Sequence, residues 1–136
     1  MVQYAHHLDD ITTSASLAAH GLLGSVEIMS LRNVDLASVP AEHLASLASC
    51  VTRKVTISNV DNTDLCPILD HVRCKQLNIE SQSLSSEESE ALLQAMETRV
   101  KSVILDNNVD VARAMIPSTK YVRACRAVNV VYYSNR

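Results

Sequence analysis

Short segments in which apolar and polar residues alternate recur along the chain. Four have the form apolar–x–apolar and lie near residues 29–31, 55–57, 77–79 and 103–105, and a fifth candidate lies near residues 128–133. Alternation with a period of two is typical of a β-strand that buries one face. The last apolar residues fall at 31, 57, 79, 105 and 130, which gives units of 22 to 26 residues. The spacing therefore predicts four or five repeated units with one strand each, and we expect Leu31, Ile57, Ile79 and Leu105 to stack as one buried column.

Between these segments the apolar residues follow helical spacing. The clearest helix begins at Ser85, which with Glu88 fits a capping box, and acidic residues occupy its first turn. Shorter apolar stripes follow Pro40 and surround Pro67, and a stripe from 8 to 22 predicts an N-terminal helical unit over about residues 1–25. Helices and strands thus alternate, and we predict one domain over residues 1–136.

Two α/β architectures suit this alternation. Strands of a doubly wound sheet are covered on both faces and are nearly continuous apolar runs. Here polar side chains alternate with the apolar ones, as in the pairs Ser30 with Arg32, Thr56 with Ser58, and Asn78 with Glu80. We therefore predict a solenoid with parallel strands on its concave face and helices on its convex face. A small doubly wound α/β domain is the alternative.

The segment from Val26 to Leu36 resembles the leucine-rich-repeat pattern L-x-x-L-x-L-x-x-N-x-L, with Val26, Met29, Leu31 and Leu36 at its apolar positions. Unit length and helical connections look most similar to the ribonuclease-inhibitor-like repeats of NOD-like innate immune receptors in chordates. The resemblance implies a curved solenoid that recognises another protein. The asparagine position of the pattern is matched by Asn108 alone; the other units carry Val34, Val60 and Gln82.

Composition and charge narrow the classes of partner. Aromatic residues make up only 3% of the chain, so the core must be aliphatic. The net charge is −3, and the charges are mixed along the chain. Binding of nucleic acid needs a basic patch, so we expect no nucleic-acid partner. No segment is long enough to cross a membrane, and we expect no signal peptide in residues 1–10, which lack a basic region. We expect a cytoplasmic protein if Met1 is the native start.

The sequence carries no pattern typical of an enzyme. Two glycines cannot form a phosphate-binding loop, and no serine lies in a nucleophile elbow. The four cysteines form no C-x-x-C pair, so we expect reduced and mostly buried thiols, with disulfides as the alternative. We predict no catalytic residues, no cofactor and no metal ion.

The polar positions of the strands and of the turns after them predict a binding surface. Parallel strands present every second side chain on one rigid face. The candidate residues on this face are Ser30, Arg32, Asn33, Thr56, Ser58, Asn59, Asn78, Glu80, Ser81, Ile104, Asp106 and Asn107. We predict a protein-recognition module, in keeping with an immune or signalling receptor. The alternatives are a structural or regulatory spacer within a longer protein, and a doubly wound domain with a small-molecule or phosphorelay role.

The C-terminal strand candidate raises the question of self-association. It is apolar and nearly uncharged, and the outermost strand of a sheet leaves its hydrogen-bonding groups unpaired. We predict that this end continues into further residues or pairs with a second copy, giving a homodimer through Val130, Val131, Tyr132 and Tyr133. The alternative is that this strand pairs inside the sheet.

Overall fold

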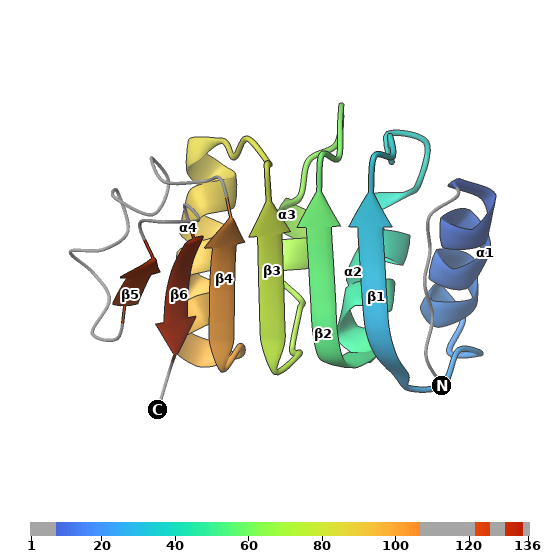
Figure 1. The fold of residues 1–136 in the computed structure, drawn as a ribbon. Helices are drawn as coiled ribbons and strands as arrows, with labels where there is room; N and C mark the ends of the chain where they lie inside the picture. Colours follow the sequence, from blue (N-terminus) through green and yellow to red (C-terminus); the bar gives the residue numbers. More distant parts are fainter. Residues whose placement is uncertain (1–7, 107–121, 126–129, 135–136) are drawn as a thin grey trace.

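The computed structural model describes residues 8–106, 122–125 and 130–134, and all structural statements below concern these residues. Helices and strands alternate through the first part of the chain, as predicted (Figure 1). The elements are α1 (Leu8–Ala19), β1 (Val26–Arg32), α2 (Ala41–Cys50), β2 (Val51–Ser58), α3 (Cys66–Leu69), β3 (Gln76–Glu80), α4 (Ser86–Thr98), β4 (Ser102–Asp106), β5 (Val122–Cys125) and β6 (Val130–Ser134).

All six strands form one sheet in the order β1-β2-β3-β4-β6-β5. Neighbours among β1 to β4 are parallel, which confirms an α/β fold with a four-stranded parallel sheet and helices. Figure 1 shows α2, α3 and α4 behind the same face of this sheet, with α1 beyond β1 at one end. Because these four strands are adjacent in the order of the chain, each connecting segment spans a single strand spacing.

The C-terminal strands depart from this parallel arrangement. β6 runs antiparallel to β4 on one side and to β5 on the other. Only residues 126–129 separate β5 from β6, whereas a parallel return needs a crossover of about a dozen residues or more. The prediction of a fifth parallel strand near residues 128–133 is therefore wrong in direction. Both edges of β6 are paired inside the sheet, and self-association of the chain stays a prediction.

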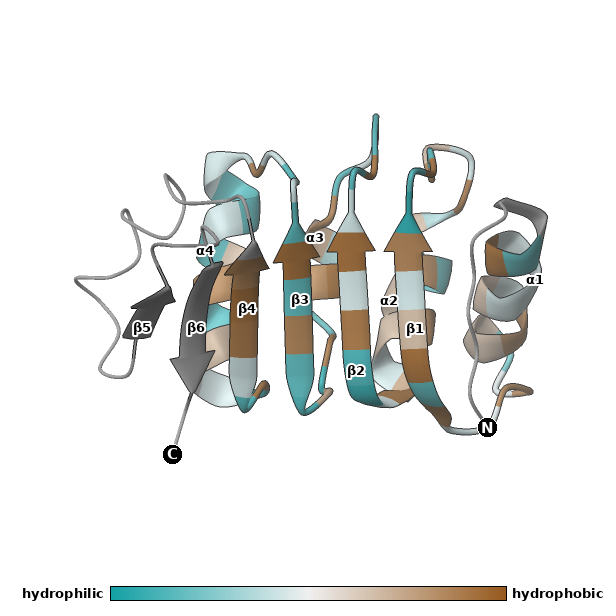
Figure 2. Ribbon diagram, in the orientation of Figure 1, coloured by the Kyte–Doolittle hydropathy of each residue, from teal (hydrophilic) through white to brown (hydrophobic). Residues whose placement is uncertain are grey.

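Apolar side chains of the four parallel strands meet in register beneath the helices. Leu31, Ile57, Ile79 and Leu105 are consecutive partners across the sheet and are at most 2% exposed. Figure 2 shows the resulting bands of hydrophobic and hydrophilic residues along β1, β2 and β3. The predicted buried column of last apolar residues is confirmed, because in-register strands stack equivalent side chains.

The turns after the strands repeat the same backbone conformation. Asn33, Asn59 and Ser81 each follow a strand directly and have positive φ angles of 52°, 50° and 49°. Asparagine tolerates this left-handed region better than most residues, because its short side chain forms local hydrogen bonds. The Asn59 amide donates to the Asn33 side-chain oxygen at 2.8 Å, so two of these turns are also joined to each other.

A buried glutamine links the next pair of turns. Val60 N–H donates to Gln82 Oε1 at 2.7 Å, and Gln82 Nε2 donates to the Val60 carbonyl at 2.9 Å. Gln82 thereby satisfies both backbone groups of a buried residue in the preceding unit. Gln82 occupies the position of asparagine in the sequence pattern given above, and its side-chain amide supplies both a donor and an acceptor to this turn.

The helical layer is uneven in length. α4 has 13 residues and begins with the predicted capping box, in which Glu88 N–H donates to Ser85 Oγ at 3.1 Å and Ser85 N–H donates to Glu88 Oε1 at 2.9 Å. α2 has 10 residues, but α3 has only four. The unit that contains α3 is the short one of 22 residues, so its connection completes a single helical turn.

Candidate protein-binding face

The face of the parallel sheet that lies away from α2, α3 and α4 is called the open face below. Every second residue of each strand points to it, and register arranges these residues in three rows across the sheet. The first row contains Ile28, Lys54, Gln76 and Ser102; the second contains Ser30, Thr56, Asn78 and Ile104; the third contains Arg32, Ser58, Glu80 and Asp106. The open face is thus a rigid and largely polar surface.

The second row is less accessible than predicted. Ser30, Thr56 and Asn78 are 6%, 3% and 8% exposed, and only Ile104 remains half-buried. Successive rows lie about 6.6 Å apart along each strand, so longer side chains of the outer rows can cover the short ones between them. Arg32 Nε donates to Ser30 Oγ at 3.1 Å, and Gln76 Nε2 donates to Asn78 Oδ1 at 2.8 Å. The expectation that this row is open is therefore corrected for these three residues.

The third row contains the strongest electrostatic feature of the open face. Arg32 Nη1 and Glu80 Oε2 form an ion pair at 2.6 Å, which passes over Ser58 and joins β1 to β3. The Arg32 side chain is 42% exposed and that of Glu80 is 25% exposed, so both remain accessible to a partner. In this setting the pair stabilises the fold by at most about 1 kcal/mol, and its main effect is to fix two charged groups in place.

The turn residues of the prediction lie next to this row. Asn33, Asn59 and Ser81 are exposed where β1, β2 and β3 end. Asp106 pairs with Glu80 in the register of the third row, but its side chain is outside the described residues, as is the whole of Asn107. The accessible residues among those predicted therefore lie together at one edge of the open face, where β1, β2 and β3 end.

The first row was not among the predicted site residues. Ile28, Lys54, Gln76 and Ser102 are half-buried, and together they extend the open face toward the beginning of the strands. The prediction considered only residues at and after the apolar–x–apolar cores. Continuing the period-two alternation backward by two residues in each strand identifies this row.

Cys50, Cys66 and Cys74 are free, and the last two have thiols that resist ionisation. Burial raises the pKa of Cys74 from 9.0 to about 11, against backbone hydrogen bonds that lower it. Burial also raises the pKa of Cys66 to about 11, and the nearby Asp64 carboxylate adds to this effect. Both thiols are therefore protonated near neutral pH, the form that is neither a nucleophile nor a metal ligand. Cys74 is buried as predicted, whereas Cys50 and Cys66 are half-buried.

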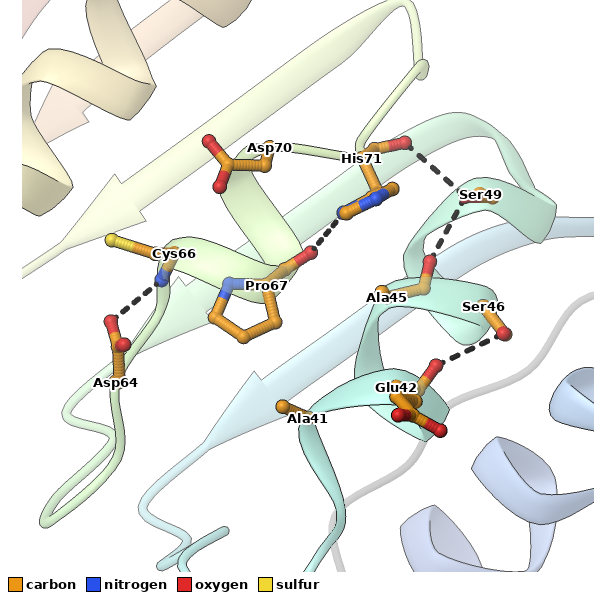
Figure 3. A pocket seen from close by; sticks show the side chains of 10 residues that line it. All are labelled: Ala41, Glu42, Ala45, Ser46, Ser49, Asp64, Cys66, Pro67, Asp70 and His71. Carbon is orange, nitrogen blue, oxygen red and sulfur yellow. Dashed lines mark hydrogen bonds between the residues drawn. The ribbon is translucent and has the colours of Figure 1, made fainter.

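The helical face carries a groove between α2 and α3 (Figure 3). Its volume is about 510 Å³. Its lining residues are Ala41, Glu42, Ala45, Ser46, Ser49, Asp64, Cys66, Pro67, Asp70 and His71. No local pattern in the sequence singles out this groove. The short 22-residue unit is nevertheless a signal of it, since one helical turn cannot fill the space beside α2.

The described residues contain no group of three or more His, Cys, Asp or Glu side chains that could hold a metal ion. Of the described helices, none has the length and apolar character needed to span a membrane.

Comparison with protein-family models, with curated proteins and with solved structures found no significant match.

Proposed function

We propose that this protein is a recognition module that binds a partner protein through the open face of its parallel sheet. The observation that carries the proposal is the placement of α2, α3 and α4 on one side, which leaves a polar, in-register surface on the other (Figure 1). A rigid surface of this kind loses little conformational entropy when a partner binds.

The accessible charges give the open face its selectivity. Arg32 and Glu80 hold each other in a fixed geometry, and Lys54 adds a half-buried cation in the first row. A partner with complementary charges gains from this arrangement, while a partner with like charges at these points is repelled. The half-buried Ile28 and Ile104 provide apolar contact at the two sides of the face.

The sequential strand order supports a solenoid of the leucine-rich-repeat type. Neighbouring units repeat the strand, the left-handed residue after it and the buried apolar column. Solenoids of this type bind partners on the face lined by their strands. The resemblance of residues 26–36 to the leucine-rich-repeat pattern supports the same function and, within it, a role in an immune or signalling receptor.

The test uses the full chain as bait in an extract of its source cells, with mass spectrometry of the retained proteins. We expect a partner that the unmodified chain retains and that the variant Arg32→Glu loses, because the substitution reverses a charge on the open face. The matched control is Glu87→Lys on the exposed surface of α4, and it should retain the partner. Retention of nothing would favour the spacer function, and loss only with Glu87→Lys would contradict an open-face site.

A further inference from the structure

The groove between α2 and α3 has the dimensions of a short helix. It extends along α2 from Ala41 to Ser49, which are eight residues apart and therefore separated by about 12 Å along the helix axis. That length corresponds to about two helical turns. The groove lies where α3 stops after four residues, while α2 and α4 on either side continue for 10 and 13.

The walls of the groove permit close approach. Along α2, the small residues Ala41, Ala45 and Ser49 follow a spacing of four and line one wall. Figure 3 shows Pro67 and His71 on the opposite wall. His71 Nδ1 lies 2.9 Å from the Pro67 carbonyl oxygen, which fixes the ring. Small side chains let a second helix pack at the short end of the usual interaxial range of about 8–10 Å.

The charges at the rim are all negative. Glu42, Asp64 and Asp70 line the groove and are exposed, and no ion pair involves them in the described part of the chain. Figure 3 shows Glu42 and Asp64 toward one end and Asp70 toward the other. The groove has no Lys or Arg in its lining. Arg99, which contacts α3, donates to the Leu69 and Asp70 carbonyl oxygens from the C-terminal end of α4.

We propose that this groove binds a basic amphipathic helix of a partner protein, at a site separate from the open face. Apolar side chains of that helix would pack on Ala45 and Pro67, and its Lys or Arg residues would lie near the three carboxylates. The added helix fills the gap that the short α3 leaves in the helical layer. Helix-in-groove binding uses apolar anchors of this kind together with complementary charges at the rim.

The acidic rim and the helical walls of the groove favour a basic helix over other classes of binding partner. Nucleic acid and acidic peptides are repelled by three unpaired carboxylates. An extended peptide on this face has no sheet edge beside the groove with which to pair, since the walls are α2 and α3. A helix satisfies its own backbone hydrogen bonds, so only its side chains need partners in the groove.

The test measures binding of a defined probe to the full chain. The probe is a fluorescein-labelled synthetic peptide of about 18 residues, with Leu and Ala on one helical face and Lys on the other. We expect saturable binding in fluorescence anisotropy that weakens as salt increases. The triple variant Glu42→Gln, Asp64→Asn, Asp70→Asn should weaken binding about tenfold. Asn at residue 64 retains the side-chain oxygen that accepts from Cys66 N–H.

A matched control separates the groove from net charge. The variant Asp35→Asn, Glu87→Gln, Glu90→Gln removes the same number of exposed carboxylates elsewhere and should change affinity by less than about twofold. Ala45→Arg should block the groove, and Ser49→Arg, at an exposed position, serves if Ala45→Arg lowers the melting temperature. Each variant is checked by circular dichroism.

Several outcomes would overturn the proposal. Equal weakening by the two triple variants would show attraction to the whole acidic protein and no specific site. The same conclusion follows if the arginine substitutions have no effect. Absence of saturable binding, or equal binding of a proline-containing peptide of the same composition, would also reject a helix as the occupant. Arg32→Glu on the open face should leave probe binding unchanged, so failure here and failure of the open-face function are distinguishable.

Discussion

At the scale of single residues, the buried aliphatic column stabilises the stacking of the units. Ile57 and Ile79 are fully buried between in-register neighbours. We expect Ile57→Ala or Ile79→Ala to lower the free energy of unfolding by about 1 to 4 kcal/mol, because each leaves a cavity under the helices. Urea denaturation measures the change. Arg53→Ala, on the exposed part of β2, is the control, and equal losses in all three variants would contradict the column.

Because the Cys74 thiol is buried, the free energy of unfolding depends on pH in the alkaline range. The folded state raises the pKa of Cys74 from 9.0 to about 11, so it holds this proton more tightly than the unfolded chain does. The resulting stabilisation is complete below pH 9 and is lost as pH rises toward about 11. We expect the stability difference between the unmodified protein and Cys74→Ala to fall by roughly 2 kcal/mol over this interval. A pH-independent difference in urea denaturation would contradict the raised pKa.

At the scale of elements, one carboxylate connects two units. Glu88 is 8% exposed, and its Oε2 accepts from Leu65 N–H at 2.8 Å while Oε1 completes the capping box of α4. Glu88 thus accepts hydrogen bonds from a backbone N–H group at the start of α3 and from one at the start of its own helix. The capping box was predictable from sequence because it is local. The bond to Leu65 was not, because residues 23 positions apart meet only when the units stack.

This double role predicts an unequal effect of neighbouring substitutions. Glu88→Ala should lower the free energy of unfolding by about 2 to 4 kcal/mol, because it leaves two backbone N–H groups without acceptors. Glu87→Ala, next in sequence and exposed, should cost less than about 1 kcal/mol. Thermal and urea unfolding followed by circular dichroism give both values. Similar losses would show that Glu88 acts only through the charge of the first turn.

The ion pair between Arg32 and Glu80 joins β1 to β3 but contributes little to the free energy of unfolding. In a double-mutant cycle with Arg32→Ala and Glu80→Ala, the coupling energy should be below about 1 kcal/mol and should decrease with added salt. A larger, salt-independent coupling would mean that the pair is a structural link between β1 and β3 rather than an accessible part of a binding surface.

At the scale of the whole molecule, the arrangement of layers predicts the shape in solution. One layer of helices covers one face of the sheet, and β1 to β4 lie side by side in the order of the chain (Figure 1). We expect small-angle X-ray scattering to give a pair-distance distribution with a tail toward long distances, as a plate produces. A symmetric distribution, typical of a nearly spherical particle, would contradict this arrangement. Measurement over a concentration series also tests the predicted self-association.

The sequence by itself determined the elements and the buried side of each strand. Period-two alternation, helical apolar stripes and the Ser85–Glu88 capping box depend on residues a few positions apart, so they can be read along the chain. The same patterns located Arg32 and Glu80 on the face away from the core, and their near-regular spacing predicted the buried column that includes Ile57.

Only the tertiary structure decided how the units meet. The covering of Ser30 by Arg32, the hydrogen bonds of Gln82 to Val60 and the antiparallel direction of β6 depend on which residues of different strands and turns become neighbours. The groove beside α3 likewise arises from a difference in length between adjacent helices. Such contacts join residues far apart in sequence, and the local pattern around each residue contains no information about its partner in the next unit.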